Sequence, residues 1–130
     1  MVWAGRVLSA LPVLLLLFSA AMKLMRVPAA VEGFAKYGYP AGAVLGLGVV
    51  ELACTLLYVF PGTAVLGAIL LTGYLGGATA THLRAGEAYF MPIVLGVVLW
   101  LGLFLRDARL RALLPWRKSL TPAAGTRPAE

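Results

Sequence analysis

The stretch Leu45–Tyr58, LGLGVVELACTLLY, places one carboxylate, Glu51, inside an otherwise apolar run. A lone acid at the middle of an apolar helix costs about 2.5–3.5 kcal/mol even on lenient membrane-insertion scales. Such a carboxyl group must be hydrogen-bonded, ion-paired or neutral. We therefore expect the other long apolar segments to surround Glu51, which is the first candidate for a functional residue.

Composition places the chain among membrane proteins. Of its 130 residues, 62% are hydrophobic and only 12% are charged, whereas a soluble domain carries about 25% charged residues. A helix that spans a bilayer needs about 20 residues, so four spans nearly exhaust the chain. The sequence predicts an all-α, integral membrane four-helix bundle over residues 1–118, followed by a disordered tail over residues 119–130.

Four apolar segments have the length of a membrane span. They are Trp3–Leu24, Ala41–Phe60, Thr63–His82 and Tyr89–Leu105. The first segment also has features of a cleaved signal peptide, but its apolar run is as long as a span. Between the first two segments, Met25–Pro40 is more polar and favours a short amphipathic helix at the membrane interface.

Small residues recur at four-residue spacing in the second and third apolar segments. The pairs are Gly42 and Gly46, Gly73 and Gly77, and Gly76 and Ala80, and Gly67 is a further glycine of the third segment. This spacing lets membrane helices approach closely. We therefore expect these positions at contacts between helices.

The net charge of +6 is distributed over the ends of the apolar segments rather than over a basic, aromatic surface. Nucleic-acid binding is therefore not expected. With four spans, both termini share one side with most of the basic residues. These are Arg6, Arg106, Arg109, Arg111, Arg117, Lys118 and Arg127. The positive-inside rule then predicts that both termini are cytoplasmic.

Glu51 follows Pro40 by 11 residues, which is about 16 Å along a helix and close to the bilayer midplane. Lys23, His82 and Arg84 lie at the outer ends of the first and third spans. We expect a polar cleft that opens to the outer leaflet, with Glu51 at its base and these three cations at its rim. Lys23 either pairs with Glu51 or extends to the lipid headgroups.

Hydroxyl groups near the expected cleft are candidates to bind the Glu51 carboxyl group. They are Ser19, Thr55, Thr72 and Thr79. Desolvation should favour a protonated Glu51 unless Lys23 or His82 reaches it. Tyr58 and Tyr74 are predicted to be packing residues.

Several kinds of chemistry lack the residues that they need. The single cysteine, Cys54, allows neither an internal disulfide nor a CxxC pair. The single histidine, His82, leaves haem without a second histidine ligand, so no intrinsic haem is expected. No phosphate-binding loop, metal-binding cluster or Ser/His/Asp arrangement is visible. Electron transfer would therefore need a cofactor or a partner protein.

A set of short motifs points to a known family. They are Ser19–Leu24 (SAAMKL) followed by Pro28, Phe34–Pro40 (FAKYGYP), Glu51-Leu52, and Leu70–Ala78 (LLTGYLGGA) followed by Thr81-His82. Together they resemble the DoxX-like family over roughly residues 5–115. The resemblance implies a small four-helix protein of the bacterial inner membrane, whose relatives are linked to a terminal quinol oxidase, to thiosulfate:quinone oxidoreduction and to oxidative-stress complexes. By position it selects Lys23, Glu51 and His82 as characteristic polar residues, although most members have no assigned activity.

The sequence thus favours an accessory or quinone-interacting subunit of a membrane redox system, with Lys23, Glu51, His82 and Arg84 around a polar cleft. The cofactor stays open, with a quinone as the candidate, and no catalytic residue or metal site is assigned. Expected partners are the lipid bilayer and either other redox subunits or further copies of the chain. Two alternatives stay open: a component of a small-molecule or proton-coupled permease, and a purely structural or assembly protein.

Overall fold

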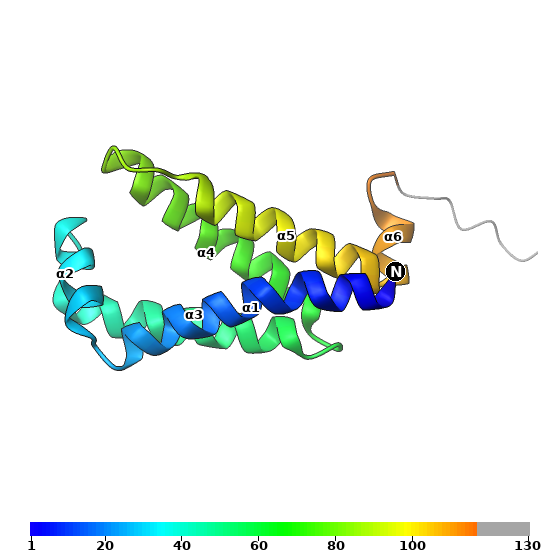
Figure 1. The fold of residues 1–130 in the computed structure, drawn as a ribbon, viewed down its shortest axis with the longest axis horizontal. Helices are drawn as coiled ribbons and strands as arrows, with labels where there is room; N and C mark the ends of the chain where they lie inside the picture. Colours follow the sequence, from blue (N-terminus) through cyan, green and yellow to red (C-terminus); the bar gives the residue numbers. More distant parts are fainter. Residues whose placement is uncertain (117–130) are drawn as a thin grey trace, which may run out of the picture.

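The computed structural model describes residues 1–116, and all regular secondary structure in that range is helical (Figure 1). The elements are α1 (Val2–Leu24), α2 (Pro28–Lys36), α3 (Ala41–Val59), α4 (Ala64–Arg84), α5 (Phe90–Arg106) and α6 (Ala108–Leu113). The predicted all-α membrane bundle is confirmed. The predicted disordered tail lies outside the described residues.

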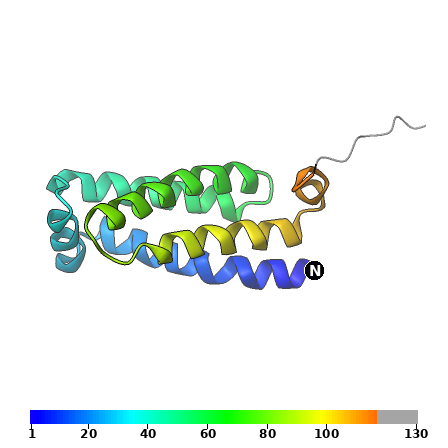
Figure 2. The ribbon, with the colours of Figure 1, turned by 90° about the horizontal axis from the view of Figure 1, so that it is seen from above.

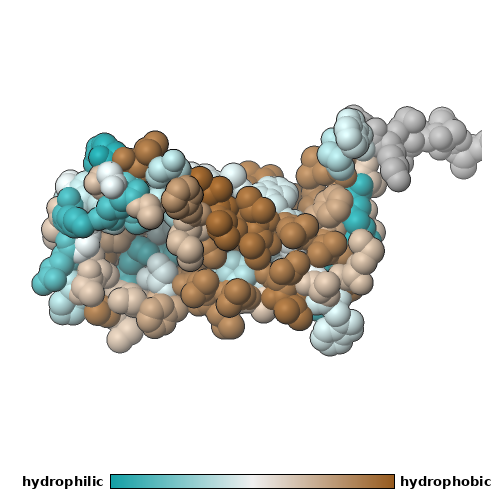
Figure 3. Space-filling model, turned by 45° about the horizontal axis from the view of Figure 1, so that its top comes forward, coloured by the Kyte–Doolittle hydropathy of each residue, from teal (hydrophilic) through white to brown (hydrophobic). Residues whose placement is uncertain are grey.

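Three helices, α1, α3 and α4, are long and apolar enough to cross a membrane. The fourth, α5, has 17 residues and is equally apolar in character, which places it at the lower end of the usual span length. Large apolar side chains are exposed along the outside of these helices, and Figure 3 shows them as a broad brown face. The protein is therefore a membrane protein whose apolar exterior faces lipid.

The four long helices form a ring. Helix α1 packs against α3 and α5, and α4 packs against the same two helices, so α1 and α4 lie diagonally opposite each other (Figure 2). The core of the ring is apolar, and its fully buried members include Leu71, Leu99 and Leu103. A tight turn that contains Pro61 and Gly62 joins α3 to α4, so these two helices form an antiparallel hairpin.

The two ends of the ring differ. At the end that carries α6, which we call the α6 end, α1 and α5 cross closely, because Gly5 leaves space for the backbone of Gly102 and Arg106. At the other end, which we call the α2 end, α1 and α3 diverge from α4 and α5 (Figure 1). Helix α2 lies across this open end, as the predicted interfacial helix, and none of its residues is buried.

Most of the predicted glycine contacts are wrong for the part of the chain that the structure describes. A Cβ atom added at five of the expected positions would meet no atom within 4 Å; these are Gly42, Gly46, Gly73, Gly76 and Gly77. The expected contact at Gly67 is confirmed, and close approach also occurs at Gly5, Gly48 and Gly102. The reason is helix phase: Gly48 and Gly67 share the buried stripes of α3 and α4, whereas the other expected glycines lie off them.

Candidate functional site

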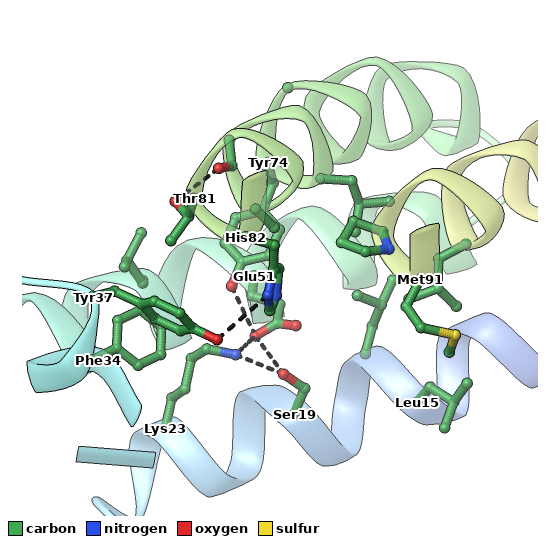
Figure 4. Close-up of a pocket in the computed structure, with 18 of the residues that line it drawn as sticks. Leu15, Ser19, Lys23, Phe34, Tyr37, Glu51, Tyr74, Thr81, His82 and Met91 are labelled. Atoms are coloured by element: carbon green, nitrogen blue, oxygen red, sulfur yellow. Dashed lines mark hydrogen bonds and ion pairs between the residues drawn. The ribbon is translucent and has the colours of Figure 1, made fainter. Parts of the chain in front are cut away.

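A cavity of about 530 Å³, which we call the main cavity, occupies the α2 end of the bundle. All four long helices and α2 contribute to its walls (Figure 4). Its polar lining residues are Ser19, Lys23, Tyr37, Tyr39, Glu51, Tyr74, Thr81 and His82, and its apolar ones include Leu15, Leu16, Phe34, Leu47, Met91 and Leu95. The lining of the main cavity therefore has a polar part and an apolar part.

Lys23 and Glu51 form a buried ion pair at the polar part of the main cavity. Lys23 Nζ lies 2.8 Å from Glu51 Oε2, and the two side chains are 10% and 2% exposed. Lys23 Nζ also donates to Ser19 Oγ at 2.6 Å and lies 5.7 Å from the centre of the Phe34 ring. The alternative left open by the sequence is thus decided in favour of pairing, because Lys23 turns toward Glu51 and away from the headgroups.

Three donors converge on one oxygen of the Glu51 carboxylate. Besides Lys23, Ser19 Oγ donates to Oε2 at 3.3 Å and the Tyr74 hydroxyl donates to it at 3.2 Å (Figure 4). Among the hydrogen bonds of residues 1–116, none reaches Glu51 Oε1. Lys23, Ser19 and Tyr74 therefore hold one carboxylate oxygen in place, and the other accepts no hydrogen bond from these residues.

Of the hydroxyl groups expected to bind this carboxylate, only Ser19 does so. Thr55 donates to the backbone oxygen of Glu51, and Thr72 and Thr79 donate to backbone oxygens one turn earlier in α4. A hydroxyl in an apolar helix often bonds its own backbone in this way. The three threonine hydroxyls therefore bond backbone oxygens of their own helices, and Thr72 Oγ1 also accepts from Trp100 Nε1 of α5 at 2.7 Å.

Tyr74 is predicted to be a packing residue, and its side chain does pack against the apolar core. The prediction is incomplete, because the Tyr74 hydroxyl also donates to Glu51. Tyr74 precedes His82 by eight residues, a spacing that keeps two residues near one helix face. That spacing is the signal from which Tyr74 could have been found. Tyr58, also predicted to pack, is fully buried at the α6 end and does not line the main cavity.

Lys23 lies deeper than the sequence suggests. Its Cβ occupies the space beside Gly48, which follows the first residue of α3 by seven positions, or about 10 Å. Helix α2 and the residues beside it connect the two heights, so the C-terminal end of α1 lies well below the N-terminal end of α3 along the bundle axis. Lys23 is consequently part of the polar interior and not of the rim.

The rim is formed by a second polar group at the α2 end, the rim cluster of Lys36, Tyr37, His82 and Glu87. The Tyr37 hydroxyl donates to Glu87 Oε2 at 2.5 Å, and Lys36 Nζ pairs with the same carboxylate. His82 Nδ1 lies 3.3 Å from the Tyr37 hydroxyl and 3.4 Å from Glu87 Oε2. These contacts fasten α2 to the loop that follows α4.

Charge and hydrogen bonding set the acidity of the rim cluster. The hydrogen bond from Lys36, followed by that from Tyr37, lowers the pKa of Glu87 to about 2. The hydrogen bond to Glu87, with some burial, raises the pKa of Tyr37. Sequence reasoning missed both Tyr37 and Glu87, because they come from two polar connections that only the fold brings together.

Arg84 does not join the cavity. Its side chain is exposed and donates to the backbone oxygen of Tyr37 at 3.0 Å. Of the four expected site residues, the structure thus brings Lys23 and Glu51 into contact, places His82 at the outer part of the same cavity, and leaves Arg84 outside. Arg84 instead holds the end of α2.

The apolar side of the main cavity reaches the lipid-facing surface between α1 and α5. Leu15 and Met91 line it from these two helices and face each other in Figure 4. Their side chains are also exposed on the outside of the bundle, by 43% for Leu15 and 61% for Met91. Figure 3 shows a hollow with polar residues inside it, next to this apolar surface. An apolar group could therefore enter from the bilayer.

The described residues contain no group of three His, Cys, Asp or Glu side chains that could hold a metal ion. Cys54 is a buried free thiol outside the lining of the main cavity. The chemistry that the site itself offers is therefore hydrogen bonding, charge and proton exchange.

Comparison with known proteins agrees with the architecture. The model of the DoxX-like family matches residues 7–102, a range that includes Lys23, Glu51, Tyr74 and His82. Neither the curated proteins nor the solved structures provide a match. The match covers most of the chain and all four long helices, and the chain therefore belongs to the DoxX-like family.

Proposed function

We propose that the protein binds a quinone in the main cavity and acts as an accessory subunit of a membrane redox system. The observation that carries this proposal is the shape of the cavity. Its polar part holds Lys23, Glu51 and Tyr74, and its apolar part meets the lipid-facing surface between Leu15 and Met91. A ligand that suits both parts has a polar head and an apolar tail.

A quinone has this construction. Its head carries two carbonyl oxygens on a small flat ring, and its isoprenoid tail is as apolar as the bilayer. The volume of about 530 Å³ lies within the range of about 300–1,000 Å³ that is usual for ligand pockets. The Lys23 ammonium has a third N–H besides those that bind Ser19 and Glu51, which supplies a donor for a carbonyl oxygen, and the opening between α1 and α5 supplies an exit for the tail.

The protein's own residues would bind the head and handle its protons. A bound quinone would carry two electrons and two protons to or from a partner subunit. Lys23 supports a carbonyl oxygen by charge, and Glu51 Oε1 accepts a hydrogen bond from the hydroxyl of the reduced form. His82 belongs to the rim cluster and also lines the main cavity, so it connects the ligand site with the polar α2 end.

The two alternative functions are less well supported. A permease needs a path through the bundle, but the α6 end is filled by the fully buried Tyr58 and by the crossing at Gly5 and Gly102. A purely structural role explains the ion pair of Lys23 and Glu51. It does not explain why the helices leave a large cavity next to that pair.

Quinone content tests the proposal. The full chain is purified in a mild detergent from membranes of its host, extracted with organic solvent, and the quinone per protein is measured by mass spectrometry. Glu51→Gln should lower the quinone content about tenfold, the effect of losing one charge-assisted hydrogen bond. Glu32→Gln, on the exposed face of α2, is the matched control and should retain wild-type content. Equal quinone content in all three proteins would contradict the proposal.

We further propose that the protein lies in the bacterial inner membrane with both termini in the cytoplasm. The α6 end carries Arg6, Arg106, Arg109 and Arg111, and this excess of basic residues supports the orientation. The main cavity would then open near the outer leaflet. Reporter fusions test this: a C-terminal fluorescent protein should be active, and a C-terminal alkaline phosphatase inactive. The reverse result would place the termini outside.

A further inference from the structure

A second, smaller cavity lies at the α6 end, far from the main cavity along the bundle. Its volume is about 180 Å³, and α1, α3 and α5 line it. Arg6 and Arg106 lie at its edge together with Ser9 and Tyr58, while Ala10, Val13 and Val59 supply its apolar side. We call it the arginine cavity, because its two charged groups are both arginines.

The packing of α1 against α5 brings the two arginines together. A Cβ at Gly5 would lie 2.9 Å from the backbone nitrogen of Arg106, and a Cβ at Gly102 would overlap Ser9. Only glycine at both positions allows this approach. Arg6, which directly follows Gly5, is thereby held beside Arg106 on the neighbouring helix.

The hydrogen bonds of Arg106 are incomplete. Its guanidinium lies over the Tyr58 ring at 4.9 Å and donates one hydrogen bond, from Nη2 to the backbone oxygen of Tyr58 at 3.3 Å. Its Nε is buried and has no hydrogen-bond partner among the described residues. Nη1 makes no hydrogen bond within residues 1–116 either, so the guanidinium has N–H donors left for the acceptor oxygens of a ligand.

The other polar groups of the arginine cavity cannot neutralise this charge. Ser9 Oγ and the Tyr58 hydroxyl bind each other at 3.0 Å, and Tyr58 donates to the backbone oxygen of Leu99. The nearby carboxylate of Asp107 caps α6 by accepting from the backbone of Arg109 and Leu110. No acidic side chain lines the cavity within residues 1–116. The site is therefore cationic, and an anion has to come from outside that part of the chain.

We infer that the arginine cavity binds the phosphate of an anionic phospholipid. Arginine matches phosphate oxygens in geometry as well as in charge. The volume of about 180 Å³ equals about six water molecules, which suits a phosphate and its glycerol but not a whole lipid. A lipid is favoured over free phosphate because Val13 and Val59 extend the cavity along the lipid-facing surface, where an acyl chain can follow.

The position along the bundle agrees with a headgroup site. Arg6 also stacks on Trp3 at 5.4 Å, and tryptophan is enriched at the level of lipid headgroups. Arg109 and Arg111 follow at the same end, so the surrounding potential attracts anionic lipid. Arg111, however, already donates to the backbone oxygens of Phe104 and Leu105, which leaves Arg6 and Arg106 as the specific pair.

Lipid binding to the purified full chain tests this inference. The probes are dioctanoyl phosphatidylglycerol, dioctanoyl phosphatidylcholine and inorganic phosphate, and the readout is the bound fraction in native mass spectrometry. Phosphatidylglycerol should bind at least about tenfold more tightly than phosphatidylcholine, because only the first carries a net charge. The doubly substituted Arg6→Gln, Arg106→Gln protein should lose this preference.

Two further variants keep the test informative. Arg6→Gln alone changes an exposed side chain and should reduce the preference without affecting folding. Arg109→Gln, an exposed arginine outside the cavity, is the control and should keep it. Equal binding of the two lipids, or an unchanged preference in the Arg6 variant, would overturn the inference. Binding of inorganic phosphate as tightly as phosphatidylglycerol would overturn the assignment to a lipid.

Discussion

The two ends of the bundle each combine a tyrosine with a cation, but they place them in different surroundings. At the α6 end, Arg106 stacks on Tyr58, and the Tyr58 hydroxyl donates to the backbone of α5. At the α2 end, Lys23 and the Tyr74 hydroxyl both donate to the Glu51 side chain. Tyr58 is thus hydrogen-bonded to the backbone of a neighbouring helix, whereas Tyr74 is hydrogen-bonded to an ionisable side chain that lines the main cavity.

The difference follows from how closely the helices approach each other at the two ends. At the α6 end, Gly5 and Gly102 let α1 meet α5, and Gly67 lets α4 meet α3. At the α2 end, Gly48 keeps α3 close to α1, but these two helices diverge from α4 and α5, and Leu15 and Met91 line the main cavity between them (Figure 1). The Tyr58 hydroxyl at the α6 end is bonded within the bundle, whereas Lys23, Glu51 and Tyr74 at the α2 end all line the main cavity.

The largest expected effect comes from breaking the ion pair at the open end. Lys23→Met leaves Glu51 buried without its cation and should lower the free energy of unfolding by about 3–5 kcal/mol. The loss can be measured by denaturation in mixed micelles. The double variant Lys23→Met, Glu51→Leu should recover most of it, since no unpaired charge remains. A double variant as unstable as the single one would show that packing, not charge, explains the loss.

The next largest effect is expected from a larger side chain in the tightest helix contact of the α6 end. A Cβ at Gly67 would overlap the backbone of Tyr58, so Gly67→Val should cost about 2–3 kcal/mol through overpacking. Gly46→Val is the matched control, because a Cβ there meets open space. Thermal unfolding in detergent should therefore separate the two variants clearly. Equal unfolding temperatures would contradict the close approach of α3 and α4 at this point.

A smaller loss of stability is expected from removing the Tyr58 hydroxyl at the α6 end. Tyr58→Phe removes the hydroxyl that bonds Ser9 and the Leu99 backbone oxygen, and it should cost about 1–2 kcal/mol of unfolding free energy. Tyr89→Phe, at the start of α5, serves as the control and should change little. A Tyr58→Phe protein as stable as the wild type would show that the hydroxyl network adds no stability.

The smallest effect concerns the rim cluster and its response to pH. Because the folded pKa of Glu87, about 2, lies below its ordinary value of 4.5, this group contributes stability that is fully present above pH 4.5. That contribution is lost as the pH falls toward 2. Unfolding between pH 5 and 2 should thus be less pH-dependent in Glu87→Gln than in the wild type. High salt should weaken the difference, since the rim is solvent-exposed.

The sequence predicted the architecture and the identity of the main ionisable residues well, for physical reasons. Span length and low charge are properties of the chain alone, and an acid in an apolar helix is conspicuous wherever it points. It was harder to predict which face of each helix is buried and how the helices are offset along the bundle axis. The contact between Lys23 and Glu51 depends on α1 ending about 10 Å below the start of α3, and no local pattern encodes that offset.

The remaining differences have the same origin. Tyr37 and Glu87 meet only because α2 lies across the end of the bundle, so neither was singled out from its own connection. Arg84 was placed at the cleft by its position after His82, but the two side chains diverge at the end of α4, and Arg84 binds backbone instead. The small-residue spacing of Gly73 and Gly77 was misread as packing, whereas both residues line the main cavity.

Gly73 offers the most direct test of the central claim, that the main cavity binds a quinone. A leucine at this position has space for its Cβ and extends into the cavity without disturbing Lys23 or Glu51. Gly73→Leu should therefore lose co-purified quinone at least about tenfold while it unfolds at the wild-type temperature, and Gly42→Leu, outside the cavity, should lose none. A stable Gly73→Leu protein with unchanged quinone content would contradict the account.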